Sequence, residues 1–162
     1  MRLTHRPAAE QDLAAICAFT QSAAELFYCF PKADFPLTPE QLQAAIDQRS
    51  DSTVVLLEGA VVAFANFYRW ETGGVCAIGN VMVAPAARGR GVARYLIEQM
   101  LDTAFTRHQA CEVQVSCFNP NVAGLLLYPQ LGFLPCSVEE RAGKGGERLA
   151  LIHFRLASPA CR

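Results

Sequence analysis

The apolar residues of the chain follow two periods, and the switches between them divide the sequence into strands and helices. Alternating apolar and polar positions, and short apolar runs between turn residues, predict strands. The predicted strands cover residues 1–8, two segments of 52–70 that meet at Glu58-Gly59, and residues 75–85, 111–118, 133–141 and 148–157. A glycine-rich segment, 142–146, joins the last two into a hairpin.

Apolar residues at helical spacing predict helices over residues 9–21, 39–49, 92–106 and 120–131. Thr38, Pro39 and Gln41 form a capping-box start for the second helix. Residues 25–37 are aromatic-rich and interrupted by two prolines, which favours a loop with a helical turn. The order β-α-α-β-β-β-α-β-α-β-β predicts an α+β (mixed α/β) fold, a mixed sheet covered by helices. Without a repeat or linker, residues 1–162 are expected to form one domain.

Composition narrows the function classes. The 162 residues are 52% hydrophobic and 18% charged, as in a compact globular protein. With 14 basic and 15 acidic side chains the net charge is −1, which lacks the basic excess of nucleic-acid binders. No apolar run has the length of a signal peptide core or a membrane span, so we expect a cytoplasmic protein without a membrane partner.

The cysteines and histidines do not show metal-site spacing. The chain has seven cysteines without a CxxC pair, and its three histidines (His5, His108 and His153) lie far apart. We therefore expect no metal and predict free thiols in a reducing compartment.

Arg88-Gly89-Arg90-Gly91 lies between an apolar strand and the strongest helical pattern of the chain. The first turn of a helix has unpaired N–H groups and the positive end of the dipole, which attract anions. The glycines let the backbone approach a phosphate, and Arg94 adds a further positive charge. The stretch predicts a pyrophosphate cradle that is neither a P-loop nor a GxGxxG motif. A solvated loop with glycines for turning is the alternative.

Two motifs resemble those of the GNAT superfamily of N-acetyltransferases. Residues 88–93 resemble its acetyl-CoA signature, Q/R-x-x-G-x-G/A, and "NVAGLLLYPQLGF" resembles its second signature through Asn121, Gly124, Leu127-Tyr128 and Gly132-Phe133. The element order agrees over essentially the whole chain. The resemblance implies a three-layer fold with a mixed, mostly antiparallel sheet that splays beside the strand before the phosphate loop.

The resemblance also implies acetyl-CoA as the co-substrate, without a metal. The acyl-pantetheine arm would pair with the backbone of Val81, Met82 and Val83. The pyrophosphate would be bound at Arg88 and by the amides of Gly89, Arg90, Gly91, Val92, Ala93 and Arg94. Asn121, or nearby Asn119, would bond to the pantetheine arm.

Tyr128 is the expected general acid. A neutral amine would attack the thioester directly, and a phenol, which is protonated at neutral pH, can then protonate the departing CoA sulfur. A tyrosine that packs the end of an apolar helix is the alternative. Pro129 disfavours helical geometry at Tyr128, so we expect the helix to end or kink there.

No carboxylate occupies the strand before the phosphate loop, where the family often has its general base. Ser116 stands where relatives that act on protein N-termini can have glutamate, and Glu112 on the same strand face is about 14 Å away. Our hypothesis is deprotonation through ordered water near Asn80, Ser116 or a backbone carbonyl.

The predicted activity is acetylation of a primary amine of a small molecule or peptide, by a monomer or homodimer. A non-catalytic acyl-CoA-binding module on the same fold, or an enzyme for another acyl-CoA, is the alternative. The aromatic residues of segment 25–37 would either line the acceptor site or close the core: Phe27, Tyr28, Phe30 and Phe35.

Overall fold

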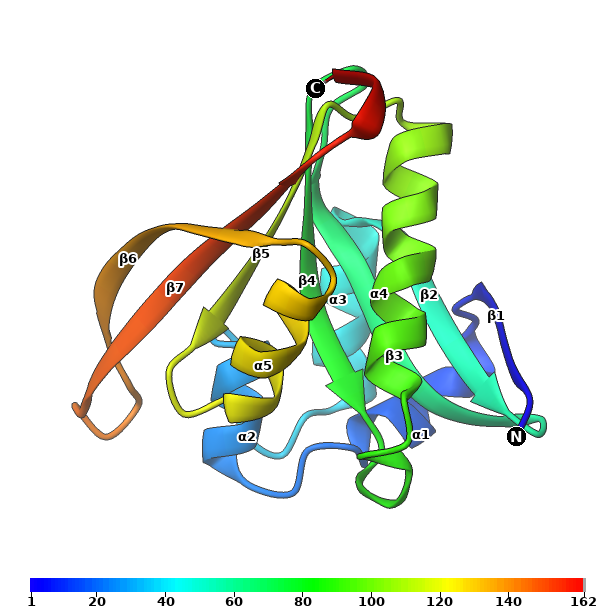
Figure 1. The fold of residues 1–162 in the computed structure, drawn as a ribbon. Coiled ribbons are helices and arrows are strands. Elements are labelled where there is room, and N and C mark those ends of the chain that lie inside the picture. Colours follow the sequence, from blue (N-terminus) through cyan, green and yellow to red (C-terminus); the bar gives the residue numbers. More distant parts are fainter. Residues whose placement is uncertain (162) are drawn as a thin grey trace.

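The computed structural model describes residues 1–161, and a seven-stranded sheet forms the middle layer of the fold (Figure 1). The strands are β1 (Leu3–Pro7), β2 (Ser50–Leu57), β3 (Ala60–Trp70), β4 (Val75–Val83), β5 (Glu112–Phe118), β6 (Leu134–Ala142) and β7 (Arg148–Ala157). Their order is β1-β2-β3-β4-β5-β7-β6, and only the β4–β5 pair is parallel. The predicted mixed, mostly antiparallel sheet is confirmed.

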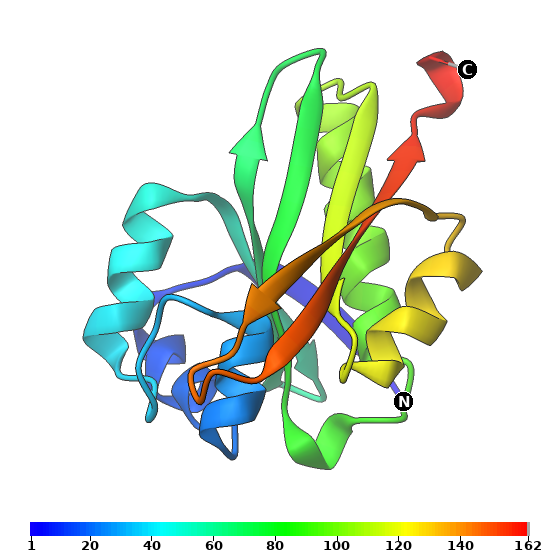
Figure 2. The same cartoon turned by 90° about the vertical axis from the view of Figure 1, so that its left-hand side faces the viewer.

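Helices cover both faces of this sheet (Figure 2). They are α1 (Leu13–Cys17), α2 (Ala23–Cys29), α3 (Pro39–Gln48), α4 (Val92–Asp102) and α5 (Val122–Gln130). The first three lie on one face, and α4 and α5 lie on the other. Neighbouring residues of a strand point to opposite faces. Val54 therefore packs in the core under α1, α2 and α3, whereas Val55 packs in the core under α4 and α5.

The helices differ from the sequence-based expectation in three places. The helix predicted over residues 9–21 is a 3-10 turn, Glu10–Asp12, followed by the short helix α1, which ends at Cys17. The expected helical turn near residue 25 is a seven-residue helix, α2, because the Ser22 hydroxyl accepts a hydrogen bond from the Glu25 amide at 3.1 Å and caps it. The long helix predicted to residue 106 leaves α geometry after Asp102 and continues as a π-helical turn, Thr103–Arg107.

The central feature of the sheet is the separation of β4 from β5. Their parallel pairing runs from Val75–Glu112 to Ile78–Val115 and then stops, although β4 continues to Val83. Asn80 has a φ of 51°, and the pairing of β3 with β4 is irregular at this point. The strands diverge toward their carboxyl ends, as Figure 1 shows, so the predicted splay is present.

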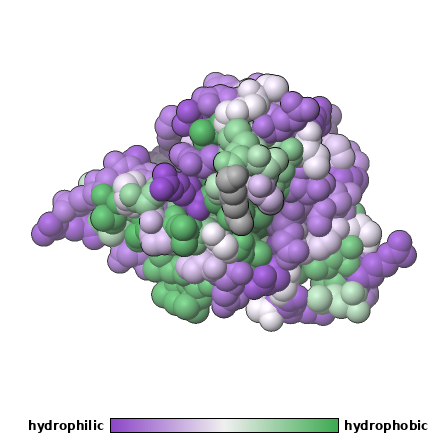
Figure 3. All heavy atoms as spheres, turned by 45° about the horizontal axis from the view of Figure 1, so that its top comes forward, coloured by the Kyte–Doolittle hydropathy of each residue, from purple (hydrophilic) through white to green (hydrophobic). Residues whose placement is uncertain are grey.

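The β6–β7 hairpin extends the sheet beyond β5. All nine residues of β6 are exposed, and the hairpin forms a hydrophilic projection from the molecule (Figure 3). On its inner side, β7 pairs with β5 along the whole length of that strand, from Glu112–Ala157 to Phe118–Leu151. The hairpin thus forms a wall beside the opening between β4 and β5.

The expectation that every thiol is free is wrong for one pair. Cys111 and Cys161 form a disulfide with their Cα atoms 5.6 Å apart. The Ser158 amide donates to the Cys111 carbonyl at 2.8 Å, which holds the turn after β7 against the start of β5. Sequence spacing could not reveal this pairing, because it depends on the antiparallel register of β5 and β7. Five cysteines remain free: Cys17, Cys29, Cys76, Cys117 and Cys136.

Candidate active site

A cavity of about 910 Å³ lies where β4 and β5 separate. It brings together most of the predicted site residues: Val81, Met82, Val83, Arg88, Gly89, Gly91, Val92, Ala93, Arg94, Asn121 and Tyr128. Arg90 and Asn119 do not line it. The edge of β4, the glycine loop before α4, helix α5 and the end of β5 therefore surround one continuous space.

The loop before α4 requires glycine at two positions. Gly89 and Gly91 have φ values of 73° and 79°, a left-handed backbone that other residues rarely adopt. The first amides of a helix have no intrahelical partner, and Gly91, the N-cap of α4, supplies no side chain to cap them. A Cβ at either glycine would meet no protein atom within 4 Å, so the space beside the loop is open to an anionic ligand.

The arginines of this loop have different environments. Arg88 ties the loop to the rest of the fold: its Nε donates to the Val83 carbonyl at 3.2 Å, and its Nη2 lies 3.0 Å from the Glu25 carboxylate. Arg94 donates to Gln130 of α5 at 2.7 Å and lines the cavity, whereas Arg90 is exposed. The positive charge expected from three arginines is therefore partly neutralised, because Arg88 has an acidic partner.

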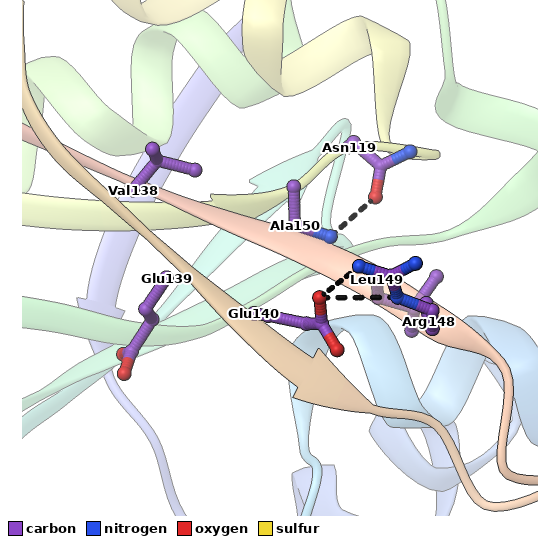
Figure 4. Close-up of a pocket in the computed structure, with 7 residues that line it drawn as sticks. All are labelled: Asn119, Val138, Glu139, Glu140, Arg148, Leu149 and Ala150. Carbon is purple, nitrogen blue, oxygen red and sulfur yellow. Dashed lines mark hydrogen bonds and ion pairs between the residues drawn. The ribbon is translucent and has the colours of Figure 1, made fainter.

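The two asparagines have separate roles. The Asn121 side-chain oxygen caps α5 by accepting from the Gly124 amide at 3.1 Å, which leaves its amide nitrogen for a ligand. The Asn119 side-chain oxygen instead accepts from the Ala150 amide of β7 at 2.8 Å, where it extends the pairing of β5 with the β6–β7 hairpin (Figure 4). The structure thus places Asn121, and not Asn119, beside the predicted pantetheine site.

Tyr128 is packed into the cavity wall by close contacts. Its ring lies 5.8 Å from the rings of Phe133 and Phe154, and the residue is 4% exposed. Gly124 makes this position possible, because a Cβ there would come within 3.2 Å of the Tyr128 ring and 2.8 Å of the Cys117 sulfur. Burial raises the pKa of the Tyr128 phenol above its ordinary value near 10, so the hydroxyl keeps its proton at neutral pH.

Pro129 does not end the helix at Tyr128. The helix continues to Gln130, and the Tyr128 carbonyl accepts from the amides of Leu131 and Phe133, both at 3.1 Å. Proline has no N–H group, so the helix loses one backbone hydrogen bond. Because Pro129 lies near the end of the helix, this loss is tolerated. Tyr128 therefore has the helical geometry that Pro129 was expected to disturb.

A hydrogen-bonded chain connects the cavity with strands β5, β7 and β6. Ser116 Oγ is 2.6 Å from His153 Nδ1, and His153 Nε2 is 2.9 Å from Glu139 Oε1. Ser116 and His153 both line the cavity. No local motif in the sequence marks His153, because its place opposite Ser116 follows from the register of β5 and β7.

Segment 25–37 contributes to both the core and the site. Phe30 is buried in the core, and Phe27 and Tyr28 pack on Phe118 with ring centroids 5.1 and 6.2 Å away. Of the four aromatic residues considered for the acceptor site, Tyr28 lines the cavity. Phe35 does not line it, and it is 44% exposed to solvent.

Cys29, on the same helix, also lines the cavity, but burial raises the pKa of its thiol to about 12. Its sulfur hydrogen-bonds to the carbonyls of Glu25 and Leu26. A thiol that stays protonated is a poor nucleophile, which disfavours an acyl-cysteine intermediate at this position.

The comparisons with known proteins agree with this geometry. The family model "Acetyltransferase (GNAT) family" matches residues 16–133, and the chain therefore belongs to the GNAT acetyltransferase family. As a member of this family, it is an acetyl-CoA-dependent N-acetyltransferase. No curated protein matches the sequence.

Solved structures share the fold over nearly the full chain. A ribosomal-protein-alanine N-acetyltransferase from Brucella melitensis is 22% identical, with a TM-score of 0.78 over 96% of this chain and 99% of the other. A spermidine N-acetyltransferase from Vibrio cholerae, in complex with CoA and spermine, is 18% identical, with a TM-score of 0.81 over 96% and 95%. A Salmonella typhimurium structure with its cofactor acetyl-CoA is 22% identical, with a TM-score of 0.75 over 97% and 94%.

Neither a membrane helix nor a metal cluster is found in the described part of the chain. No helix within residues 1–161 has both the length and the apolar character for crossing a bilayer. The same residues contain no group of three or more His, Cys, Asp or Glu side chains placed to hold a metal ion.

Proposed function

We propose that the cavity between β4 and β5 binds acetyl-CoA on one side and the primary amine of a small molecule or peptide on the other. One observation carries this proposal: the cavity is lined at once by the glycine loop of α4, the unpaired edge of β4, Tyr128, and the Ser116–His153 pair. A reaction between two bound substrates needs such a space, with an anion site at one end and proton-transfer groups at the other.

On the donor side, the amides at the start of α4 bind the pyrophosphate. The residues that supply them are Gly89, Arg90, Gly91, Val92, Ala93 and Arg94. The backbone of Val81, Met82 and Val83 pairs with the acyl-pantetheine arm, and the Asn121 amide nitrogen donates to it. Support comes from the end of strand pairing at Ile78–Val115, which leaves the edge of β4 without a partner from β5.

In the transfer step the nitrogen lone pair attacks the thioester carbonyl carbon, and the carbon–sulfur bond breaks with its electron pair on sulfur. Tyr128 donates its proton to that sulfur, so CoA leaves as a thiol. The Ser116–His153–Glu139 chain receives the proton that the amine loses. Glu139 accepts from Nε2–H, which fixes the tautomer in which Nδ1 can accept the Ser116 proton.

This assignment refines the hypothesis that deprotonation depends on water near Asn80 or Ser116. Both residues line the cavity, but the Asn80 side chain is already engaged: its oxygen accepts from Asn66 and its nitrogen donates to the Cys29 carbonyl. Ser116 is the one of the two with a proton acceptor attached, and the side chain of Glu139 at the end of the chain is 45% exposed to solvent.

A panel of amines and peptides with acetyl-CoA, measured by release of the CoA thiol, tests the activity. The proposal expects multiple turnovers with at least one acceptor and loss of turnover when the amine is blocked. Binding of acetyl-CoA without thiol release for any acceptor would indicate the alternative, a non-catalytic module. Other acyl-CoA donors belong in the same panel, because the loop contacts only the CoA part that they share.

Location and assembly complete the proposal. We propose a cytoplasmic enzyme, supported by the five free thiols, which are typical of a reducing compartment. Reduction there would open the Cys111–Cys161 bond. A monomer or homodimer is proposed as the assembly, and size-exclusion chromatography with light scattering distinguishes them.

A further inference from the structure

The cavity has many more cationic than acidic side chains. Its charged lining residues are Lys32, Arg49, Arg88, Arg94 and Arg141, with Glu25 as the acidic member. Arg88 pairs with Glu25 at 3.0 Å. Arg141 pairs with Glu139, also at 3.0 Å. Arg94 lies beside the loop proposed to bind the CoA phosphates. The two remaining cations, Arg49 and Lys32, have no acidic partner among residues 1–161.

Arg49 is held in position by a chain of buried amides. Its Nη1 donates to Asn66 Oδ1 at 3.1 Å, and Asn66 Nδ2 donates to Asn80 Oδ1 at 3.0 Å. Asn80 Nδ2 then donates to the Cys29 carbonyl at 3.0 Å, which connects the chain to α2. Asn66 and Asn80 are both buried. The guanidinium is therefore fixed before any ligand arrives, which lowers the entropy cost of binding.

The ring of Tyr68 and the backbone of β4 confine the same guanidinium. Its central carbon lies 5.4 Å from the centroid of the Tyr68 ring. Gly79 supplies the necessary space, because a Cβ there would come within 2.7 Å of both Arg49 Nη1 and the Tyr68 ring. Burial lowers the pKa of Arg49, which indicates that its charged form lacks the full hydration it would have in water.

Arg49 also has donors to spare. A guanidinium carries five N–H groups in a planar fork that matches a carboxylate or phosphonate. Within residues 1–161 its side chain makes one hydrogen bond, to Asn66. A half-buried cation with unused donors beside a cavity is the arrangement that an oxyanion would satisfy.

We propose that Arg49 binds an oxyanion of the acceptor, so that the acceptor is an amine that also carries a carboxylate or phosphonate, as a free amino acid does. This inference rests on the proposed N-acetyltransferase function and names its substrate class. A polyamine is disfavoured, because its charges would meet Lys32 and Arg49, whereas Glu25 and Glu139 are already paired with Arg88 and Arg141.

The test compares three forms of one amine: alanine, its phosphonate analogue 1-aminoethylphosphonate, and alaninamide. The corresponding three forms of phenylalanine, and spermidine, complete the panel. We expect kcat/KM at least about 10-fold higher for an oxyanion form than for the carboxamide. The ratio between carboxylate and phosphonate identifies which oxyanion the site prefers. Equal or faster turnover of the carboxamides or spermidine would overturn the inference and leave the N-acetyltransferase function intact.

Two variants connect the preference to Arg49. Arg49→Gln should lower kcat/KM for the oxyanion forms by about 10-fold or more and leave the carboxamides within about threefold. Arg2→Gln removes an exposed arginine next to the edge strand β1, outside the cavity lining, and should change neither. An unchanged preference in Arg49→Gln would overturn the inference.

A binding measurement separates this inference from the proposed function. N-acetylalanine and its methylamide are titrated calorimetrically into wild type and Arg49→Gln in the presence of CoA. If wild type binds N-acetylalanine but not the methylamide, and Arg49→Gln binds neither, the oxyanion site is supported. That result would stand even if no amine were acetylated, an outcome that would contradict only the proposed function. Equal binding of acid and methylamide, or binding of neither, overturns the oxyanion site.

Discussion

Ser116 and His153 face each other across β5 and β7, with the serine hydroxyl 2.6 Å from His153 Nδ1 and Glu139 2.9 Å from the other ring nitrogen. The pair lines the part of the cavity proposed to bind the acceptor, whereas Tyr128 belongs to α5, which covers the face of the sheet opposite α1, α2 and α3. The acid and the proposed proton acceptor thus reach the opening between β4 and β5 from opposite faces.

His153→Gln is expected to lower kcat by about 100-fold, the lower end of the range for general acid–base groups. The reason is that glutamine can hydrogen-bond with Ser116 but cannot take up its proton. Steady-state thiol release with a saturating acceptor measures the effect, and His5→Gln, at an exposed histidine of β1, is the control. Similar kcat values for wild type and His153→Gln would remove this chain from the mechanism.

Gly89→Ala and Gly91→Ala should each weaken acetyl-CoA binding, because the left-handed φ would be strained and a methyl group would occupy the space proposed for the pyrophosphate. We expect each substitution to lower the free energy of unfolding by about 1–3 kcal/mol. We also expect each to raise the Kd for acetyl-CoA, which strain at a glycine outside the site would not do. Gly59→Ala is the matched control, since Gly59 has a φ of 88°, equally open space, and a place in the β2–β3 turn outside the cavity lining.

Calorimetric titration of acetyl-CoA into the three glycine variants, with urea unfolding of each, provides the comparison. The control should lose similar stability and keep the wild-type Kd. If all three variants bind acetyl-CoA as wild type does, the pyrophosphate does not approach the loop before α4.

Asp12→Asn should remove part of the acid sensitivity of the fold. Asp12 is 3% exposed, and its hydrogen bonds from Arg6 (2.7 Å) hold its pKa below the ordinary value, despite the opposing effect of burial. A carboxyl group with a depressed folded-state pKa stabilises the fold above its unfolded pKa, and this stability disappears as the pH falls through the folded-state pKa.

We therefore expect Asp12→Asn to lower the free energy of unfolding by about 1–3 kcal/mol at pH 7 and by less below pH 4. Urea unfolding between pH 3 and 7 measures this difference. Asp102→Asn is the control, because Asp102 is exposed and has no cationic partner within residues 1–161. A constant difference between wild type and Asp12→Asn over that range would contradict the assigned ion pair.

The Cys111–Cys161 bond predicts a thiol count. Oxidised, unfolded protein should react with five equivalents of a thiol reagent and reduced protein with seven, since Cys111 and Cys161 are two of the seven cysteines. The bond closes a loop of 50 residues, for which chain entropy gives a stabilisation of about 4 kcal/mol at most. Cys161→Ser should lose this stability only under oxidising conditions, and seven reactive thiols in unreduced protein would exclude the bond.

Local patterns predicted most of the fold. Thr38 does cap α3, accepting from the Gln41 amide at 3.3 Å, and Glu58-Gly59 does form the turn between β2 and β3. The missed helix α2 also had a local signal, because Ser22 and Glu25 have capping-box spacing. These features depend on residues a few positions apart, which a sequence displays directly.

The features that sequence reasoning missed depend on contacts between distant segments. Ser116 meets His153 because of strand register, Cys111 meets Cys161 because β5 and β7 are antiparallel, and Arg49 reaches the cavity because Gly79 has no side chain. None of these pairs has a spacing that a local motif would show. The donor half of the site could be predicted because it is one continuous stretch, whereas the acceptor half is assembled from several strands and helices.

The role of Tyr128 is the central claim, and Tyr128→Phe with acetyl-CoA tests it most directly. Tyr95→Phe is the control. Tyr95 lies on α4, and its hydroxyl is 2.9 Å from the His5 ring. We predict that Tyr128→Phe lowers kcat for CoA thiol release by about 100-fold and leaves the Kd for acetyl-CoA within twofold of wild type. An unchanged kcat, or a loss of turnover that a weaker Kd explains completely, would contradict the account.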